Sequence, residues 1–446
     1  MSSPTAEPDT PPGPRSAADA PRARAAPHPA APVPAPAPGV VERWTAARVL
    51  DALAAIDRGT LDLRLPDGTV RRFGEAAAAT TGPAAAIHVS SWAFFPRVAL
   101  GGDLGFGESF VDGDWTTPDL TAVIALFIAN EEVLAGEAGR PALLRRAADR
   151  IDHLRRRNTP GGSRRNIRAH YDLGNDFFRL FLDETMTYSC ALFEAEDEPL
   201  EKAQRRKIRR ILDKAQLEPG MHLLEIGCGW GSTALTAARE YGVRVTGLTV
   251  SDEQRAWGLA RVREAGLEDR VAIELCDYRH AHGRYDRVVS IEMLEAVGHE
   301  YLGAYFAAID RMLAPGGRAV IQVITLPDQR YEGYLERVDF IQKHIFPGAV
   351  IPSLTALCDA MTRASTLVVE DLESIGPHYA PTLAAWRRRF TAEPAELARL
   401  GFDPRFQRTW EYYFAYCEAG FASRYLNDLQ LVLTRAGLPA WTGRNR

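Results

Sequence analysis

Three glycines that alternate with other residues form the first feature of the chain whose chemistry can be interpreted directly. They follow an apolar run that ends near Glu225, and a helical pattern begins at Ser232. The three are Gly227, Gly229 and Gly231. Glycine permits positive φ and lets a ligand approach the backbone, while a helix start offers N–H groups without partners. Ordinary turns also show this spacing, but the strand before it and the helix after it favour a cradle for a nucleotide-sized ligand.

The residues after the next strand discriminate between kinds of nucleotide. A nicotinamide-binding fold closes its second strand with a carboxylate that holds the ribose, whereas this strand ends in residues 247–251, which include no carboxylate. The third glycine also comes two residues after the second, not three as in the dinucleotide pattern. Both features favour a methyltransferase that binds S-adenosylmethionine. Glu225 would then serve the amino group of the cofactor, and Asp277 and Tyr278 would flank its adenine.

Apolar runs alternate with helical patterns from Met221 onward. This alternation predicts an α/β fold, a doubly wound parallel sheet of the Rossmann-like class I methyltransferase type, with its ligand at the carboxyl ends of the strands. The expected strands lie at 223–226, 244–248, 271–275, 287–291 and 319–324. The expected helices lie at 232–241, 252–265 and 302–313.

The composition excludes several classes of function. Of the 446 residues, 46% are hydrophobic and 25% charged, as in an ordinary globular protein with room for two or three domains. The net charge of −5 argues against a general nucleic-acid binder. Five cysteines without paired spacing suggest neither a disulfide framework nor a metal site, so a cytoplasmic protein is expected. Apolar runs are shorter than the ~20 residues that span a bilayer, so membrane contact would be peripheral, at the inner face.

The chain divides into three parts by composition. Residues 1–39 are rich in Pro and Ala and are expected to form a disordered tail. Residues 40–152 are expected to form a small α+β accessory domain for docking or dimerisation, and residues 153–446 the methyltransferase domain. Within the accessory domain we expect helices at 41–58 and 120–135 and strands near 59–69, 86–89 and 97–100.

Two clusters of basic residues stand out in this acidic chain. One lies at 155–168, and the other lies on a helix expected at 200–214, from Arg205 to Arg210. A charge run on a helix is usually a solvated face, but concentrated basic groups also suit an anionic surface such as phospholipid head groups. The sequence alone leaves both interpretations open.

Four separated stretches resemble the cyclopropane-fatty-acyl-phospholipid synthase family, whose members use S-adenosylmethionine to act on lipid double bonds. The resemblance extends from about Asn166 to Thr434, and residues 101–109 resemble the small N-terminal domain of that family. The first stretch is 166–178, which includes His170, and the second is 186–191, which includes Tyr-Ser-Cys-Ala. The third is the glycine loop together with Thr249-x-Ser-x-x-Gln, and the fourth combines 292–299 with 345–348.

The resemblance implies a reaction and a set of residues. A methyl group would pass from S-adenosylmethionine to the double bond of an unsaturated acyl chain in a phospholipid, and bound bicarbonate would remove a proton from the resulting carbocation. Glu295 would orient the ion by accepting its hydroxyl proton, and Tyr413 would donate to it and add cation–π stabilisation. The ring around the ion would also include Cys190 and the backbone of Ile324. Further cofactor contacts would come from His170, Tyr188, Ser189, Thr249, Ser251 and Gln254.

Two positions depart from the family pattern. Many members have histidines where this chain has Gln322 and Ala296. Gln322 could still donate a hydrogen bond to the ion, but it cannot become cationic, so the site would hold bicarbonate with less electrostatic help. The combination resembles branches that include plant-type cyclopropane synthases and actinobacterial enzymes that make a 10-methylene chain. The sequence leaves open whether the product is a cyclopropane or a 10-methylene chain. It also leaves open whether the protein forms a homodimer and whether a downstream reductase completes the product.

Each candidate residue also has a purely structural interpretation. Cys190 could be a small core residue, and Tyr413 belongs to an aromatic stripe at helical spacing. An amphipathic helix expected at 331–344, within an insertion at 327–352, would line an acyl tunnel or simply pack against the sheet. Two other functions stay open as well: a methyltransferase that alkylates an oxygen or nitrogen of a soluble metabolite, and a lipid-binding module without catalysis.

Overall fold

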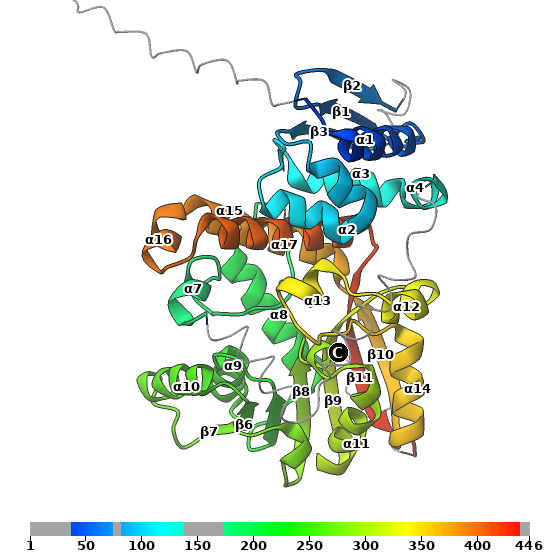
Figure 1. Ribbon diagram of the computed structural model, residues 1–446. Coiled ribbons are helices and arrows are strands. Elements are labelled where there is room, and N and C mark those ends of the chain that lie inside the picture. The colour runs from blue at the N-terminus through cyan, green and yellow to red at the C-terminus, as the bar shows by residue number, and fades with distance from the viewer. Residues whose placement is uncertain (1–36, 75–81, 138–172, 196, 438–446) are drawn as a thin grey trace, which may run out of the picture.

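The computed structural model describes residues 37–74, 82–137, 173–195 and 197–437. Within these ranges a small sheet and a large sheet lie on opposite sides of a layer of C-terminal helices (Figure 1). Three sequence predictions fall on residues outside the described ranges: most of the disordered tail, the basic cluster at 155–168, and His170.

The large sheet has seven strands in the order β10-β11-β9-β8-β5-β6-β7. Strands β7, β6, β5, β8 and β9 are parallel, whereas β11 pairs antiparallel with both β9 and β10. The strands are β5 (His222–Ile226), β6 (Arg244–Thr249), β7 (Val271–Leu275), β8 (Tyr285–Ile291), β9 (Leu313–Thr325), β10 (Leu367–Ser374) and β11 (Asn427–Arg435). All five predicted strands and the class I methyltransferase topology are confirmed, while β10 and β11 were not predicted.

The strand order reverses at β5, which lies between β6 on one side and β8 on the other. In such open sheets ligands bind at the carboxyl ends of the strands near this reversal. Helices α9 (Ser232–Tyr241), α10 (Asp252–Glu264) and α11 (Leu302–Met312) connect these strands and confirm the predicted helices. Two further helices flank the sheet, α8 (Leu200–Lys214) and α14 (Leu354–Ala364), together with short 3-10 turns at 278–280, 294–296, 299–301 and 376–378.

The N-terminal domain is built on a four-stranded sheet in the order β2-β1-β3-β4. Its elements are α1 (Val40–Leu53), β1 (Thr60–Arg64), β2 (Val70–Phe73), β3 (Ala84–Val89), α2 (Phe94–Val111), β4 (Trp115–Thr116), α3 (Leu120–Ala129) and α4 (Glu131–Glu137). The predicted strand at 97–100 is wrong, since these residues lie within α2. A run of four residues is too short to distinguish the two. Helix α2 is kinked at Gly102, and Phe94 before the kink and Phe106 and Phe110 after it lie in the same core.

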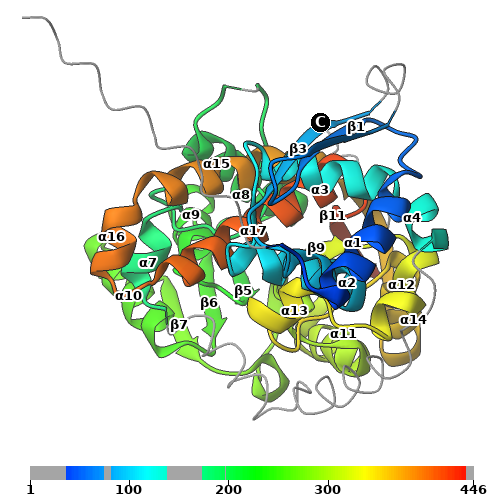
Figure 2. The same ribbon diagram turned by 45° about the horizontal axis from the view of Figure 1, so that its top comes forward.

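Helix α17 (Pro404–Ala422) connects the two halves of the molecule, as Figures 1 and 2 show. One face of α17, with Tyr412 and Ala415, belongs to the core of the N-terminal domain. Another face, with Trp410 and Tyr413, belongs to an aromatic core that also includes residues of α7 (Asn175–Arg179) and α15 (Tyr379–Ala392). Helix α16 (Pro394–Arg399) joins α15 to α17. The candidate residue Tyr413 is therefore positioned partly by the N-terminal domain.

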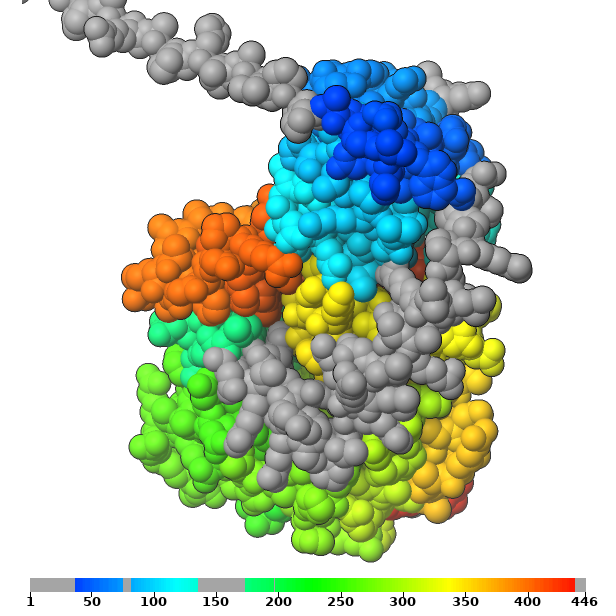
Figure 3. All heavy atoms as spheres, viewed as in Figure 1, coloured from blue at the N-terminus to red at the C-terminus, as the bar shows by residue number. Residues whose placement is uncertain are grey.

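The insertion after β9 forms two short helices, so the prediction of one helix over 331–344 is wrong. They are α12 (Asp328–Leu335) and α13 (Phe340–His344). The break has a local cause: the Asp339 backbone is extended and its carboxylate caps α13 by accepting from the Gln342 amide (2.7 Å), while Gln342 bonds back to Asp339. In Figure 3 this yellow segment lies directly against the cyan part of the N-terminal domain.

The basic side chains of α8 are occupied by internal partners. Arg205 pairs with Glu201, Arg206 with Glu194 and Glu198, and Arg209 with Glu240. Lys207 has no exposed surface and donates to the Ser189 hydroxyl. These contacts support the interpretation as a paired helix face rather than a head-group site, and they leave Lys207 as an unforeseen buried lysine.

No helix in the described part of the chain is long and apolar enough to cross a bilayer. Nor do the described residues contain a group of three or more His, Cys, Asp or Glu side chains that could hold a metal ion.

The contact between α2 and the site-bearing helices can be tested at Gly107. A Cβ atom there would lie 2.7 Å from Phe340 Cδ2 and 2.8 Å from Tyr412 Cε1, and both rings are buried. We expect Gly107→Ala to lower the free energy of unfolding by about 1–3 kcal/mol, because neither ring has room to move. Gly101→Ala, beside the kink at Gly102, meets nothing within 4 Å and should leave the free energy of unfolding nearly unchanged. Equal denaturation midpoints for the two variants would contradict this account.

Candidate active site

The glycine loop has the geometry expected of a cofactor cradle. Gly227, Gly229 and Gly231 have φ of 80°, 51° and 85°, in the left-handed region that favours glycine. The amides of Gly227 and Cys228 both donate to the Leu248 carbonyl (3.0 and 2.9 Å), which ties the loop to β6. A Cβ at Gly227 would lie 2.8 Å from Met293, whereas one at Gly229 would meet open space. Room for a ligand therefore exists at the middle glycine.

Glu225 lies at the end of β5 with 3% of its surface exposed. Its Oε2 atom is buried without a hydrogen-bond partner among the described residues. Burial raises the pKa of this carboxyl to about 8, against smaller opposing effects of Thr233 and Lys207. A buried acceptor without a partner is costly, so the site fits a ligand that brings a donor, such as the amino group of S-adenosylmethionine.

The predicted residues after β6 lie together. Ser251 caps α10 by accepting from the Gln254 amide (3.2 Å), and the Thr249 hydroxyl donates to Gln254 Oε1 (2.9 Å). Their mutual bonds fix the Gln254 side chain at the carboxyl end of β6. This is the strand end at which a nucleotide-binding fold meets the ribose.

Asp277 and Tyr278 follow β7, but their side chains already have protein surroundings. Arg279 donates to both oxygens of Asp277 (2.9 and 2.6 Å), and despite burial these bonds lower the pKa of the carboxyl. Tyr278 packs edge-on against Tyr305, with 5.5 Å between ring centroids. An adenine could still use a second lone pair of Asp277, but the carboxylate is not free for it alone.

Glu295 lies just beyond β8, and its Oε1 accepts a hydrogen bond from the Ile324 amide on β9 (2.5 Å). Its Oε2 is buried without a partner among the described residues. Burial, and then the charge of Glu292, raise the pKa of Glu295 to about 8. At pH 7 the unliganded protein therefore holds mostly a neutral acid here. The backbone of Ile324, expected in the ring around the ion, gives its amide to Glu295.

Tyr188 and Tyr413 come together from distant parts of the chain, with 2.9 Å between their hydroxyl oxygens. Phe346 lies beside both, its ring centroid 6.3 Å from that of Tyr188 and 5.9 Å from that of Tyr413. Trp386 packs against Tyr188, with 5.1 Å between the ring centroids. We call these four side chains the aromatic cluster. The sequence assigned Tyr188 to the cofactor and Tyr413 to the reaction, and the structure joins them in one hydrogen-bonded pair.

Comparison with known proteins gives this arrangement a family. The sequence pattern described as "Mycolic acid cyclopropane synthetase" matches residues 159–431. The chain belongs to this family. It is therefore an S-adenosylmethionine-dependent methyltransferase, as the glycine loop and the strand order predicted.

Two relatives illustrate the range of the family. The tuberculostearic acid methyltransferase UfaA1 of Mycobacterium tuberculosis is 44% identical over 353 residues, which cover 77% of this chain and 81% of the relative. The cyclopropane-fatty-acyl-phospholipid synthase of Escherichia coli is 37% identical over 351 residues, covering 78% of this chain and 87% of that one.

Solved structures support the same assignment. The cyclopropane synthase MmaA2 from Mycobacterium tuberculosis has a TM-score of 0.57 at 34% identity, and it covers 60% of this chain and 97% of its own. The mycolic acid cyclopropane synthase CmaA1, complexed with SAH and CTAB, has a TM-score of 0.57 at 35% identity with the same coverage.

Three predicted residues of this family member have structural partners that the sequence did not reveal. The Cys190 thiol is fully buried and donates to the Ala191 carbonyl (3.2 Å), and burial raises its pKa well above the usual range, so it is not a nucleophile. Ser189 accepts from Lys207 (2.5 Å). Gln322 Nε2 donates to both Glu292 Oε1 (2.7 Å) and Asp428 Oδ2 (2.9 Å), so both amide hydrogens are used inside the protein.

Sequence reasoning missed three groups beside the site: Glu292, which is half-buried, and Asp428 and Lys207, which are buried. Glu292 directly follows β8, three residues before Glu295, and that Glu-Met-Leu-Glu spacing was a usable signal. Asp428 lies on β11, which was not predicted, and Lys207 was counted with a surface cluster. The side chains that contact these three residues are distant from them in the sequence.

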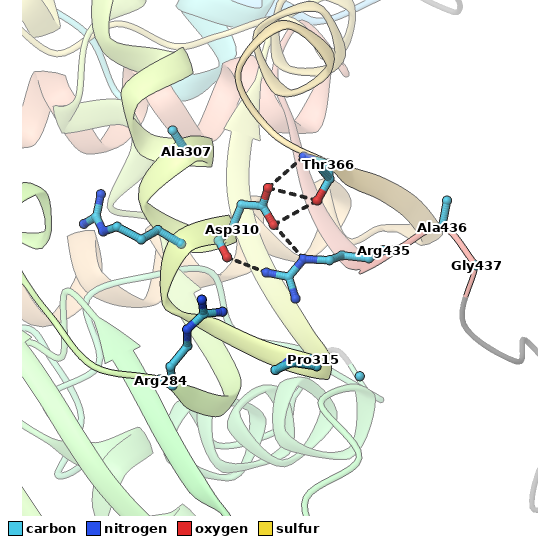
Figure 4. Close-up of a pocket in the computed structure, with 10 residues that line it drawn as sticks. Arg284, Ala307, Asp310, Pro315, Thr366, Arg435, Ala436 and Gly437 are labelled. Atoms are coloured by element: carbon cyan, nitrogen blue, oxygen red, sulfur yellow. Dashed lines mark hydrogen bonds and ion pairs between the residues drawn. The ribbon is translucent and has the colours of Figure 1, made fainter.

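A hollow at the opposite edge of the sheet is not part of this site. It is lined by Arg284, Asp310, Thr366 and Arg435, among others, at the amino ends of β8 and β9. Figure 4 shows Asp310 bonded to both Thr366 and Arg435, which joins α11 to β10 and β11. The contacts are structural.

The raised pKa of Glu295 predicts a pH dependence of stability. Because the folded pKa, about 8, lies above that of an unfolded glutamate, the neutral acid contributes stability that is complete below about pH 4 and is lost as pH rises through 8. We expect Glu295→Gln to reduce the fall in melting temperature of the unliganded protein between pH 6 and 9. Glu332→Gln, at an exposed site, should retain the wild-type slope. Equal slopes for wild type and Glu295→Gln would show that the acid is not neutral in the fold.

Proposed function

We propose that this enzyme transfers a methyl group from S-adenosylmethionine to the double bond of an unsaturated acyl chain in a phospholipid, with bicarbonate as the proton acceptor. The observation that carries the proposal is the free oxygen of Glu295, buried beside β9 at the carboxyl edge that also bears the glycine loop. S-adenosylmethionine supplies a methyl group on a sulfonium, which is electrophilic enough to react with an alkene.

The aromatic cluster supports a non-polar substrate. An isolated alkene is a weak nucleophile, so it must be held against the methyl donor in a place without competing water. Tyr188, Tyr413 and Phe346 provide such surroundings, and their ring faces can stabilise a cation. A methyltransferase acting on oxygen or nitrogen would instead need a base aimed at a polar substrate.

Bicarbonate is favoured because the site holds polar groups that can orient an anion. Glu295 can share a proton with it through Oε2, and the Tyr413 hydroxyl can donate to it. Ala296 and Gln322 supply no cation. An ion held by neutral donors retains more of its basicity than one beside a protonated histidine, which suits removal of a proton from a carbocation.

Two products follow from the same first step. Loss of a proton from the new methyl group with ring closure gives a cyclopropane, whereas a hydride shift before that loss gives a 10-methylene chain. One relative is named a tuberculostearic acid methyltransferase and another a cyclopropane synthase. A 10-methylene product would need a reductase to become a methyl branch.

Expression in a bacterial host that makes oleoyl phospholipids tests the proposal directly. Fatty acids are analysed by mass spectrometry and proton NMR. A gain of one CH₂ with upfield ring protons identifies cyclopropane, and vinylidene protons identify the methylene product. An unchanged fatty-acid profile with folded protein would refute the function, and turnover of a soluble amine or alcohol without lipid would favour the alternative.

The role of Glu295 predicts a separation of binding from turnover. We expect Glu295→Gln to lower kcat by about 10²-fold or more, because the amide cannot exchange a proton with the ion. The affinity for S-adenosylmethionine, measured by calorimetry, should stay within about twofold, since the glycine loop and Glu225 are untouched. Glu332→Gln is the matched surface control. Parallel loss of turnover and cofactor affinity would contradict the assigned role.

The structure also offers a candidate membrane contact on α1. Val40, Val41 and Trp44 are 74%, 64% and 58% exposed, and Arg48 lies over the Trp44 ring at 5.4 Å. Exposed apolar and aromatic side chains beside arginine suit the interface of an anionic bilayer. We therefore place the peripheral membrane contact at α1 rather than at the paired basic face of α8.

This placement predicts the outcome of liposome sedimentation. The double variant Val41→Ser with Trp44→Ser should bind vesicles of phosphatidylglycerol and phosphatidylethanolamine at least about tenfold more weakly, because apolar area no longer enters the interface. Val368→Ser, at an exposed valine of β10, is the control and should bind like wild type. Intact vesicle binding together with a changed oligomeric state would make α1 a subunit contact instead.

A further inference from the structure

Glu292 is the residue that joins the parts of the candidate reaction site. It follows β8 directly and has a φ of 46°, an uncommon left-handed conformation for a residue with a side chain. Its backbone amide donates to the Gln322 carbonyl (2.8 Å) on β9. Such a conformation persists only where the surrounding contacts determine it, and it tends to occur at functional sites.

The Glu292 side chain accepts three hydrogen bonds from three separate elements. Oε1 accepts from the Cys190 backbone amide (2.8 Å) and from Gln322 Nε2 (2.7 Å), while Oε2 accepts from the Tyr379 hydroxyl (2.6 Å). All three partners are donors, so the group acts purely as an acceptor, which is the role of a carboxylate. One carboxylate thus holds the segment before α8, strand β9 and helix α15 together.

Two of these partners, Cys190 and Gln322, lie close in sequence to a proposed site residue. Cys190 lies two residues after Tyr188, which bonds to Tyr413. Gln322 lies two residues before Ile324 on the same strand, and the Ile324 amide holds Glu295. Glu292 itself lies three residues before Glu295. The third partner, Tyr379, packs against Trp386 of the aromatic cluster, with 6.0 Å between ring centroids. All three contacts of Glu292 therefore lead to the aromatic cluster or to Glu295.

The surroundings show how the protein tolerates a carboxylate at this depth. Lys207 is fully buried and donates to the Ser189 hydroxyl (2.5 Å). Burial lowers the pKa of the Lys207 amine, and the charge of Glu292 opposes this shift. Burial, and then the charges of Glu292 and Glu295, raise the pKa of Asp428 well above its usual range. Glu292 is thus the central acceptor of a group of polar side chains.

We propose that Glu292 is a positioning residue of the reaction, which fixes the Cys190 backbone and the Gln322 side chain so that Glu295 and the aromatic cluster keep their arrangement. This inference rests on the proposed function and deepens it. It also assigns Gln322 to the support of the site rather than to contact with an anion. Glu292 acts through these partners and does not itself touch a reacting atom.

The test compares four full-length proteins: wild type, Glu292→Ala, Glu292→Gln and the control Asp310→Asn. Asp310 also accepts bonds from several donors, at the opposite edge of the sheet. Turnover is measured on vesicles of oleoyl phosphatidylglycerol and phosphatidylethanolamine, the affinity for S-adenosylmethionine by calorimetry, and the melting temperature by scanning calorimetry.

We expect Glu292→Ala to lower kcat by about 10²-fold, the usual effect of misplacing reacting groups by about an ångström, with cofactor affinity within about twofold. Glu292→Gln keeps an oxygen that can accept from Cys190 and Gln322, and should recover kcat to within about fivefold of wild type. Asp310→Asn should lower the melting temperature and leave kcat unchanged. A purely structural role would give losses that follow the melting temperature in all variants.

Several results would overturn the inference. They are wild-type kcat in Glu292→Ala, equal loss of turnover and cofactor affinity, and no recovery in Glu292→Gln. If Glu292→Ala does not fold, Glu292→Asp replaces it: the shorter side chain cannot reach all three donors, and an unchanged kcat would refute the role. Wild-type protein without lipid product would refute the proposed function and the inference with it, whereas active wild type with unaffected variants refutes the inference alone.

Discussion

The hydrogen bond from the Ile324 amide to Glu295 joins the two strands between which the candidate reaction site lies. Strands β8 and β9 run parallel and adjacent, so the bond holds a carboxyl group at the carboxyl ends of both. A buried acid is costly unless its oxygens have partners. One oxygen of Glu295 has its partner within the protein, and the other does not among the described residues. The contacts around Glu295 hold this second oxygen in position.

That network reaches into both halves of the molecule. Tyr413 belongs to α17, whose other face lies in the core of the N-terminal domain, and Gly107 of α2 allows the close approach. In the proposed reaction, the non-polar double bond carries no charge to which the enzyme could bind before the chemistry begins. Position must then come from packing, and this explains why the aromatic cluster is held by a domain boundary as well as by its own helix.

The sequence predicted what is local and missed what depends on distant contacts. The strands from β5 to β9 and the glycine loop have strong apolar runs and turn residues, so their types were clear. Strand β10 was missed because it is an edge strand with mostly exposed residues, and β11 because buried Asp428 and Gln430 interrupt its apolar pattern. Lys207 looked like one more charge on a basic helix. Its burial is set by Ser189 and Glu292, which a pattern along α8 cannot show.

Gln322 shows how the meaning of one residue depends on its partners. Taken alone, glutamine in place of histidine is a weaker ligand for an anion. In the structure its amide is held by Glu292 and Asp428, so it belongs to a different network in which a carboxylate lies near Glu295. Burial, and then the charge of Glu292, raise the pKa of Glu295 to about 8. The unliganded protein therefore holds an acid that can donate, whereas the family resemblance implied a carboxylate that accepts. Because Gln322 cannot become cationic, the proposed bicarbonate would keep more of the basicity that deprotonation of a carbocation requires than it would beside a protonated histidine.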